Sequence, residues 1–180
     1  MKATGIVRRI DDLGRIVIPK EIRRTLRIRE TDPMEIFTDR EGQIILKKYS
    51  PIGELAASAG EYADTLAMVS KKTVCITDRD QVVAAAGSGR KELSGKPLTK
   101  ELDSCIANRE SVTSKKGDAD FVQAVTDMDF ENEVICPVIC SGDVLGSVII
   151  LDKEAKSTFT DVELKLGHAF AEIIGKQMEG

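Results

Sequence analysis

Two short segments near the start of the chain, residues 5–10 and 15–18, are rich in β-branched side chains and predict strands. Between them, residues 11–14 (Asp-Asp-Leu-Gly) predict a turn in which the glycine can adopt positive φ. Neither segment alternates between apolar and polar side chains, so both faces of each strand need to be covered. The apolar positions are Ile6, Val7, Ile10, Ile16, Val17 and Ile18.

A short helix and a hairpin follow. Pro19 favours the first position of a helix, where its missing N–H has no bond to lose. Pro33 disfavours the helical conformation of the residue before it. Residues 34–38 and 43–47 then predict a hairpin around residues 39–42 (Asp-Arg-Glu-Gly).

Fifty residues bury too little apolar surface to be stable alone without disulfides, a metal or a partner. With so little chain available, a second copy is the natural cover for strands that are apolar on both faces. The pattern therefore predicts a homodimer formed through residues 1–50.

The body of the chain, residues 51–180, alternates helical and strand patterns. Ser50 is a candidate N-cap for a helix, with Pro51 beside it. Thr160 and Glu163 predict a capping box for the last helix. Another helix is predicted at residues 98–107, and strands at 73–77, 81–86, 121–126, 133–140 and 144–151. This order predicts an α+β fold with a mostly antiparallel sheet.

In the helix that follows Ser50, apolar residues recur at alternating steps of three and four, as in helices packed in a bundle. Because this helix leaves a module that is already dimeric, we expect its stripe to contact another subunit and to produce a homotetramer. The alternative is that the helix packs only against the sheet of its own domain. The stripe consists of Ile52, Leu55, Ala59, Tyr62, Leu66 and Val69.

The net charge of −4 is divided unevenly along the chain. Residues 1–50 carry 12 Lys and Arg against 8 Asp and Glu, whereas residues 51–180 carry 14 against 22. A basic module on an acidic body is typical of a chain in which one part meets a polyanion. We therefore expect double-stranded DNA as the partner of the first fifty residues.

Residues that could support catalysis or metal binding are few. The four cysteines, Cys75, Cys105, Cys136 and Cys140, have no framework spacing and are expected to be buried free thiols. Cys136 and Cys140 would lie about 13 Å apart along a strand, at ~3.3 Å per residue, which is too far to share a zinc ion. His168, the only histidine, is expected to be structural or at the surface. We expect no cofactor, no metal and no enzymatic activity.

No apolar run reaches the roughly 18 residues needed to span a bilayer, so no membrane partner is expected. The first residues also lack the apolar core of a signal peptide. The sequence therefore predicts a cytoplasmic protein, associated with the nucleoid.

Residues 5–26, GIVRRIDDLGRIVIPKEIRRTL, closely resemble the AbrB-type swapped-hairpin DNA-binding domain. With Glu35-Ile36 and residues 44–49, the resemblance covers about residues 1–50. In that family two chains interleave their hairpins into one intertwined β-barrel, and arginines of the loops and of the helix start face the DNA. The resemblance implies that Arg8, Arg15, Arg23 and Arg24 bind DNA, with Arg9, Lys2 and Lys47 as secondary candidates.

Arginine suits this role because its planar fork can hold a phosphate or bind the edge of a guanine. The sequence has no recognition helix, since the helix after Pro19 is only about two turns long. Thr31 departs from the family pattern, because many relatives place glycine there. A related antitoxin domain of the MazE type is the alternative. Antitoxins usually continue into a disordered tail that wraps the toxin, whereas a structured acidic body follows here.

The stretch from Ile135 to Ile150 resembles a GAF domain, with a PAS domain as the alternative. The resemblance implies an antiparallel sheet with flanking helices and a small-molecule pocket near residues 88–98 and 114–120. Neither a cyclic-nucleotide motif nor a tetrapyrrole-binding cysteine–histidine signature is present, so any ligand is unidentified, and the domain could instead serve only to oligomerise.

In this order the two domains resemble regulators of late gene expression in spore-forming bacteria. We therefore expect a repressor, an activator or both, acting on sporulation-stage genes. A GAF-type methionine sulfoxide reductase is the enzyme alternative, and the DNA-binding module argues against it.

Overall fold

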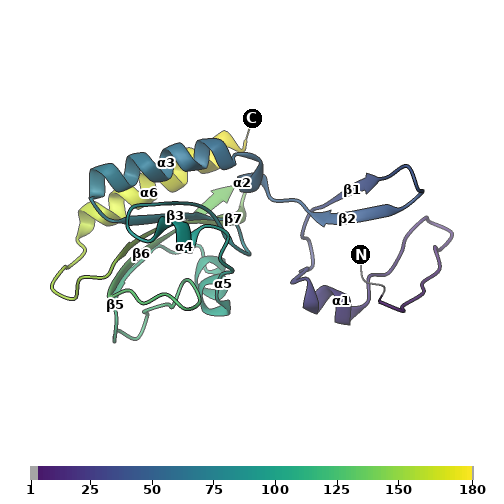
Figure 1. Cartoon of the computed structure of the whole chain (residues 1–180), viewed down its shortest axis with the longest axis horizontal. Helices are drawn as coiled ribbons and strands as arrows, with labels where there is room; N and C mark the ends of the chain where they lie inside the picture. Colours follow the sequence, from purple (N-terminus) through teal and green to yellow (C-terminus); the bar gives the residue numbers. More distant parts are fainter. Residues whose placement is uncertain (1–3, 180) are drawn as a thin grey trace. The chain divides into compact units, whose positions relative to one another are not determined.

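The computed structural model describes residues 4–179. The chain forms two compact units, Met1–Tyr49 (unit 1) and Ser50–Gly180 (unit 2). Figure 1 shows the small first unit and the larger second one, which contains the main sheet.

Unit 1 contains the short helix α1 (Lys20–Thr25) and the hairpin of β1 (Met34–Thr38) and β2 (Ile44–Lys48). Pro19 is the N-cap of α1, so the proline stands one residue before the first helical position that the sequence predicts for it. The hairpin turn is closed by the Asp39 carboxylate, which accepts hydrogen bonds from the N–H groups of Glu41 and Gln43, each at 2.9 Å. The helix and the hairpin are confirmed.

The two strands predicted at residues 5–10 and 15–18 are not formed in this chain. Among the described residues, the backbone bonds of this region are those that close its turn, from Asp11 N to Arg15 O (3.1 Å) and from Gly14 N to Asp11 O (3.0 Å). A strand exists only where a neighbouring backbone offers it N–H and C=O groups. A single chain supplies no such neighbour here.

Within the described residues, unit 1 has no buried apolar core: both hydrophobic cores consist of residues of unit 2, and Pro19 is the one buried residue of unit 1. Its apolar side chains face outward instead, with exposures of 87% for Val7, 72% for Val17 and 66% for Ile36. A monomeric protein rarely leaves so much apolar surface exposed.

Unit 2 is built on a five-stranded sheet in the order β4-β3-β7-β6-β5, in which every neighbouring pair is antiparallel. The strands are β3 (Thr73–Thr77), β4 (Val82–Ala86), β5 (Val112–Lys115), β6 (Asn132–Cys140) and β7 (Asp143–Asp152). The helices are α2 (Pro51–Glu54), α3 (Ala56–Ser70), α4 (Arg90–Leu93), α5 (Lys100–Ala107) and α6 (Asp161–Gln177). This confirms the α+β class and the antiparallel sheet.

The sheet separates two apolar cores. In Figure 1, α3 and α6 lie side by side along one face of the sheet, where their side chains join the first core. The second core lies on the other face and includes residues of α4 and α5. Successive residues of β6 enter different cores: Val134 and Cys136 belong to the first, and Ile135 to the second. Strands buried on both faces account for the continuous apolar runs in the sequence.

The predicted strand at residues 121–126 is wrong. Apart from one isolated bridge between Val125 and Leu98, this segment is irregular and covers the second core, in which Ala124 and Val125 are buried. The fifth strand is instead β5, a short segment with little apolar character that the sequence analysis missed. The apolar run at 121–126 resembles a strand pattern because this loop packs its own side chains against the core.

Strand β6 contains Pro137, paired with Ser147 of β7. On its other side, β6 pairs with β5 only from Asn132 to Ile135. The proline therefore stands beyond the end of β5, where β6 has no second neighbour among the described residues. Proline is tolerated there because no ladder bond requires its missing N–H.

Both predicted helix caps of unit 2 are confirmed. Thr160 Oγ1 accepts a hydrogen bond from Val162 N at 3.2 Å, and Glu163 Oε2 accepts one from Thr160 N at 2.8 Å, which completes the capping box. Ser50 Oγ accepts one from Gly53 N at 3.0 Å at the start of α2.

The stripe predicted as a subunit contact lies partly in the core of its own unit. Ile52, Ala59 and Leu66 are at most 2% exposed and belong to the first core, and Tyr62 packs against that core. The alternative, packing on the helix's own sheet, therefore describes these residues. A heptad-like spacing also arises where one helix packs against another of the same unit, as α3 does with α6. Val69 is 56% exposed and remains available to a partner.

Candidate nucleic-acid interface

The turn at residues 11–15, which is closed by hydrogen bonds, presents Arg15. The Oδ1 atom of Asp11 accepts hydrogen bonds from Leu13 N (3.1 Å) and Arg15 N (2.8 Å), while Oδ2 pairs with Arg15 Nε at 2.8 Å. Gly14 has a φ of +74°, which glycine adopts without strain. The hydrogen bonds from Arg15, its backbone N–H first, lower the pKa of Asp11. The Arg15 side chain is 68% exposed and faces solvent.

Helix α1 supplies the next two predicted arginines. Arg24 is exposed and Arg23 is half-buried, and both lie in the last turn of the helix. The chain turns back directly after them, because Ile28 N donates a hydrogen bond to Arg23 O at 2.8 Å. The helix therefore presents two adjacent guanidinium groups on a short, capped support.

Four other DNA-binding candidates were predicted: Arg8, Arg9, Lys47 and Lys2. Arg8, Arg9 and Lys47 are exposed and, among the described residues, their side chains have no hydrogen-bonding or ionic partner in the protein. Cations in this state can bind phosphate without first breaking an internal ion pair. Lys2 lies outside the described residues.

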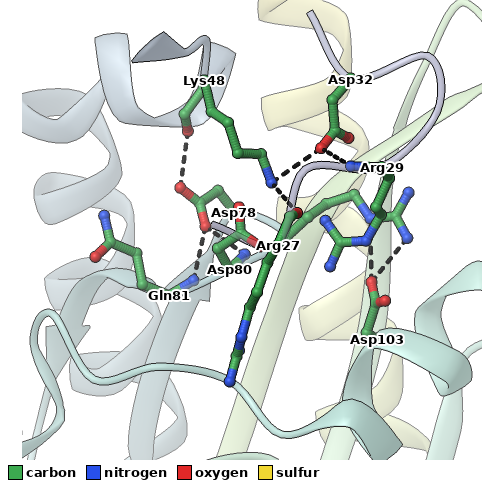
Figure 2. Close-up of polar contacts among 10 residues, drawn as sticks. Arg27, Arg29, Asp32, Lys48, Asp78, Asp80, Gln81 and Asp103 are labelled. Atoms are coloured by element: carbon green, nitrogen blue, oxygen red, sulfur yellow. Dashed lines mark hydrogen bonds and ion pairs between the residues drawn. The ribbon is translucent and has the colours of Figure 1, made fainter. Parts of the chain in front are cut away.

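A polar network that the sequence analysis missed holds the hairpin to the segment after α1. Lys48 Nζ forms an ion pair with Asp32 Oδ2 and donates a hydrogen bond to Arg27 O, both at 3.0 Å. Asp32 Oδ2 also accepts a hydrogen bond from Arg29 N at 2.8 Å (Figure 2). Lys48 thus serves the internal structure of unit 1, whereas its neighbour Lys47 points to solvent. Opposite charges 16 residues apart give no local sequence signal for such a pair.

The carboxyl group of Glu133, in unit 2, has a strongly raised pKa. Glu133, on β6, is 1% exposed, and its Oε1 atom accepts hydrogen bonds from Ser114 Oγ (2.8 Å) and Val122 N (2.5 Å). Burial raises the pKa of Glu133 to about 7, and the nearby Asp120 adds to the rise. The side chain therefore ties β5 and the segment around Val122 to the face of the sheet that carries the second core.

Two of the four cysteines, Cys75 and Cys136, are buried in the cores. Burial raises the pKa of Cys75 to about 12 and that of Cys136 to about 11, so both are protonated thiols at neutral pH. All four cysteines are free, but only Cys75 and Cys136 are buried; Cys105 and Cys140 are half-buried, so the prediction of four buried thiols is wrong for these two. Within residues 4–179, no group of three or more His, Cys, Asp or Glu side chains is arranged to hold a metal ion. The histidine, His168, is exposed on α6.

None of the helices that the structure describes has the length and apolar composition needed to cross a bilayer.

Two protein families match the chain in separate parts. The family described as "Stage V sporulation protein T C-terminal, transcription factor" matches residues 54–179. The family described as "Antidote-toxin recognition MazE, bacterial antitoxin" matches residues 7–54. The second match covers the DNA-binding module alone, so it does not extend the antitoxin alternative to the rest of the chain.

Similar proteins support the same division. Stage V sporulation protein T of Bacillus subtilis (strain 168) is 49% identical over 181 residues, which cover 99% of each chain. The transition state regulatory protein AbrB of the same organism is 65% identical over 51 residues, or 28% of this chain and 52% of that protein. The resemblance of the first fifty residues to AbrB is confirmed.

Unit 2 has the fold of GAF domains. The GAF domain of PixJ from Thermosynechococcus elongatus covers 73% of this chain and 89% of its own, with a TM-score of 0.59 and 10% sequence identity. The type II free methionine-R-sulfoxide reductase from Thermoplasma acidophilum covers 71% of this chain and 94% of its own, with a TM-score of 0.55 and 13% identity. At these identities the likeness concerns the fold alone.

The full-length match and the family match to residues 54–179 both lead to a transcription factor rather than an enzyme. The match of the first fifty residues to AbrB adds a DNA-binding domain of a type that forms oligomers. A protein of this kind acts on DNA in the cytoplasm. The chain therefore belongs to the stage V sporulation protein T family and is a DNA-binding transcriptional regulator of sporulation.

Proposed function

We propose that unit 1 binds double-stranded DNA as an intertwined homodimer and that Arg8, Arg15, Arg23 and Arg24 make the main contacts. The observation that carries the proposal is that Arg15 projects from a closed turn and Arg23 and Arg24 from a short helix, while Arg8 is exposed in the preceding segment, in a unit with a net positive charge. In a dimer each arginine is present twice, so a single substitution removes two contacts.

Alanine variants of the four arginines test this assignment. Each is titrated, at several salt concentrations, on a duplex that the protein selects from a random library (the selected duplex) and on a random-sequence duplex. An arginine that contacts phosphate should weaken both duplexes alike and lower the salt slope by about one unit per lost contact. An arginine that contacts a base edge should cost roughly 1–3 kcal/mol on the selected duplex.

Arg40 provides the control. It lies exposed in the turn of the distal hairpin, and its alanine variant should bind like the parent. If Arg8→Ala and Arg24→Ala bind normally while Arg40→Ala does not, the assignment of the DNA-binding face is wrong.

The dimer follows from the exposed apolar surface of unit 1. Val7, Val17 and Ile36 have no cover in a single chain, and the uncovered backbone of residues 5–10 and 15–18 can pair with a second copy. A fragment of residues 1–53 should sediment as a dimer. A stable monomeric fragment would rule this out.

We further propose that unit 2 raises the dimer to a tetramer, through the exposed apolar residues of its two long helices rather than through the buried part of the predicted stripe. These residues are Met68 and Val69 near the end of α3, and Val162 and Ile173 on α6, with exposures of 73%, 56%, 59% and 44%. The full-length chain should sediment as a tetramer, and Val69→Asp should sediment as a dimer. A dimeric parent would contradict the proposal.

The acidic unit 2, with a net charge of −8 over residues 51–180, is expected to modulate binding rather than to contact DNA. Linking two DNA-binding dimers makes the second engagement intramolecular. Deletion of residues 54–180 should therefore lower the apparent affinity for a long duplex with two sites. Equal affinities of fragment and full-length protein would count against this role.

A small-molecule ligand is proposed for the face of unit 2 that carries α4 and α5, where the Glu133 carboxylate is buried. Native mass spectrometry of full-length protein from sporulating cells should show an adduct that is lost on denaturation. A spectrum with the bare chain mass alone would contradict this proposal. Nucleoid association is checked by fluorescence microscopy, in which the tagged protein should coincide with stained DNA.

A further inference from the structure

The Asp11–Arg15 pair joins a DNA-binding candidate to a carboxylate, although an acid beside DNA repels phosphate. The contact is well defined: Asp11 Oδ2 lies 2.8 Å from Arg15 Nε, while Oδ1 binds two backbone N–H groups of the same turn. We propose that Asp11 is a positioning residue, which fixes the Arg15 guanidinium for sequence-dependent contact and limits binding to other sequences. The proposal rests on the proposed function, in which Arg15 binds DNA.

The contact with Asp11 leaves the two terminal Nη groups of Arg15 free to bind other acceptors. A guanidinium group has five N–H donors, and Nε supplies only one of them. The pair of Nη groups at the end of the fork can still bind two acceptors at once, as in contacts to a guanine edge or a phosphate. The Nε contact restricts a side chain that is 68% exposed and otherwise free to move. An arginine side chain has many rotamers, so restriction before binding reduces the conformational entropy that is lost on the DNA.

Stability alone does not account for the pair. Both side chains are partly exposed, 68% for Arg15 and 37% for Asp11, and exposed ion pairs add little to folding. The turn is already closed by Gly14 N to Asp11 O and by the two backbone bonds to Asp11 Oδ1. What the Oδ2–Nε contact adds is the direction of the arginine.

The acid also has an electrostatic consequence. A negative charge beside Arg15 weakens the attraction to phosphate on every sequence, whereas the fixed fork favours only a sequence that offers acceptors in the right place. Asp11 is therefore expected to lower non-specific affinity and to raise discrimination, which is a difference between two affinities. Its lowered pKa, which arises from the Arg15 hydrogen bonds, keeps the carboxylate charged across the neutral range.

Asp12 provides a matched control. It is the next residue, it is exposed, and its side chain has no partner among the residues that the structure describes. Asp12→Asn changes the charge of the turn by the same amount as Asp11→Asn and leaves the Arg15 contact intact. Asp11→Asn keeps an oxygen that can accept the two backbone bonds, so the turn persists.

The experiment measures the ratio of affinities for the selected duplex and the random duplex, with full-length protein at fixed salt. Asp11→Asn should lower the ratio about 3- to 10-fold without weakening binding to the random duplex, whereas Asp12→Asn should leave the ratio unchanged. Arg15→Lys, which keeps the charge but has no Nε fork, should lower the ratio like Asp11→Asn. Equal ratios for Asp11→Asn and Asp12→Asn would overturn the proposal.

A double-mutant cycle separates positioning from a general effect on folding. In the Arg15→Ala background, Asp11→Asn should have no further effect on the ratio, since there is no guanidinium group to position. A persistent loss in that background would show a structural role and overturn the inference. If Arg15→Ala itself binds both duplexes like the parent, the proposed contact of Arg15 with DNA fails. That result is distinct from a failure of Asp11→Asn alone.

Discussion

Replacement of Glu133 by glutamine should stabilise the protein at neutral and alkaline pH. The carboxyl group is 1% exposed, and burial raises its pKa from an ordinary value of 4.5 to about 7. A buried carboxyl favours its protonated form, so the folded state holds this proton at pH values where the unfolded chain has released it. Between pH 4.5 and 7 the unfolded state therefore binds fewer protons, and the free energy of unfolding falls as the pH rises.

The size of the effect follows from the shift. About 2.5 pKa units at 1.36 kcal/mol per unit correspond to about 3 kcal/mol, fully expressed above pH 7 and absent below pH 4.5. Glutamine is neutral throughout and keeps a carbonyl oxygen that can accept the bonds from Ser114 Oγ and Val122 N. The variant should match the parent at pH 4 and exceed it by about 3 kcal/mol at pH 8.

Urea denaturation followed by far-ultraviolet circular dichroism, at intervals from pH 4 to 8, measures this difference. Glu172→Gln, on the exposed side of α6, is the control and should track the parent at every pH. A constant difference between Glu133→Gln and the parent across the range would refute the reasoning, because it would mean that Glu133 does not titrate differently in the two states.

Four further predictions concern backbone conformation and helix capping, and each is checked by the midpoint of urea denaturation. Gly146→Ala should destabilise unit 2 by several kcal/mol, because a Cβ at this position would lie 1.9 Å from Thr77 O. A Cβ at Gly60, in α3, would have no neighbouring atom within 4 Å, so Gly60→Ala should stabilise the protein by about 0.5–1 kcal/mol. A destabilised Gly60→Ala would contradict this account. Thr160→Ala removes half of the α6 capping box and should cost about 1 kcal/mol. Thr31→Gly should stabilise by about 1 kcal/mol, because threonine holds a φ of +69° there, and a loss of stability would show that the threonine side chain is needed.

The sequence predicted most of unit 2 because its elements carry local signals. The caps at Ser50 and Thr160 depend on neighbouring residues, and the strands at 73–77, 133–140 and 144–151 are apolar runs of strand length. The strand predicted at 121–126 is wrong because a loop that packs against the core has the same apolar pattern as a strand that is buried in a sheet. Sequence periodicity reports burial and not hydrogen bonding, and only the latter distinguishes a strand from a covered loop.

Unit 1 was harder to predict, because its strands depend on a partner and not on local signals. The apolar faces of residues 5–10 and 15–18 were identified correctly, but whether they become strands depends on a backbone outside the chain. For the α3 stripe, the spacing of Ile52, Ala59 and Leu66 predicted a buried helical face without saying which surface buries it, and the answer was their own core. In each case the apolar pattern indicates that these residues must be buried, but it does not indicate which surface buries them.

The candidate DNA-binding residues could be predicted from charge and resemblance because arginine binds polyanions in any fold. The Asp11–Arg15 contact could not, since opposite charges four residues apart interact only when the intervening turn brings them together. The Lys48–Asp32 pair depends likewise on the path of the chain after α1. The type of residue that binds DNA can be inferred from the sequence, but the orientation of its side chain depends on the three-dimensional path of the chain.

Pro137 has a consequence for the fate of the unfolded chain. The segment Val134–Ile139 has four β-branched residues out of six and no charge, and apart from Pro137 this is the composition of segments that stack into amyloid-like assemblies. Proline interrupts that segment at a place where the native β6 has no second neighbour and therefore loses no ladder bond. An incoming strand from another molecule would find no N–H donor at this position. The same residue that the sheet accommodates without cost thus acts as a gatekeeper against aggregation while the chain is being synthesised and folded.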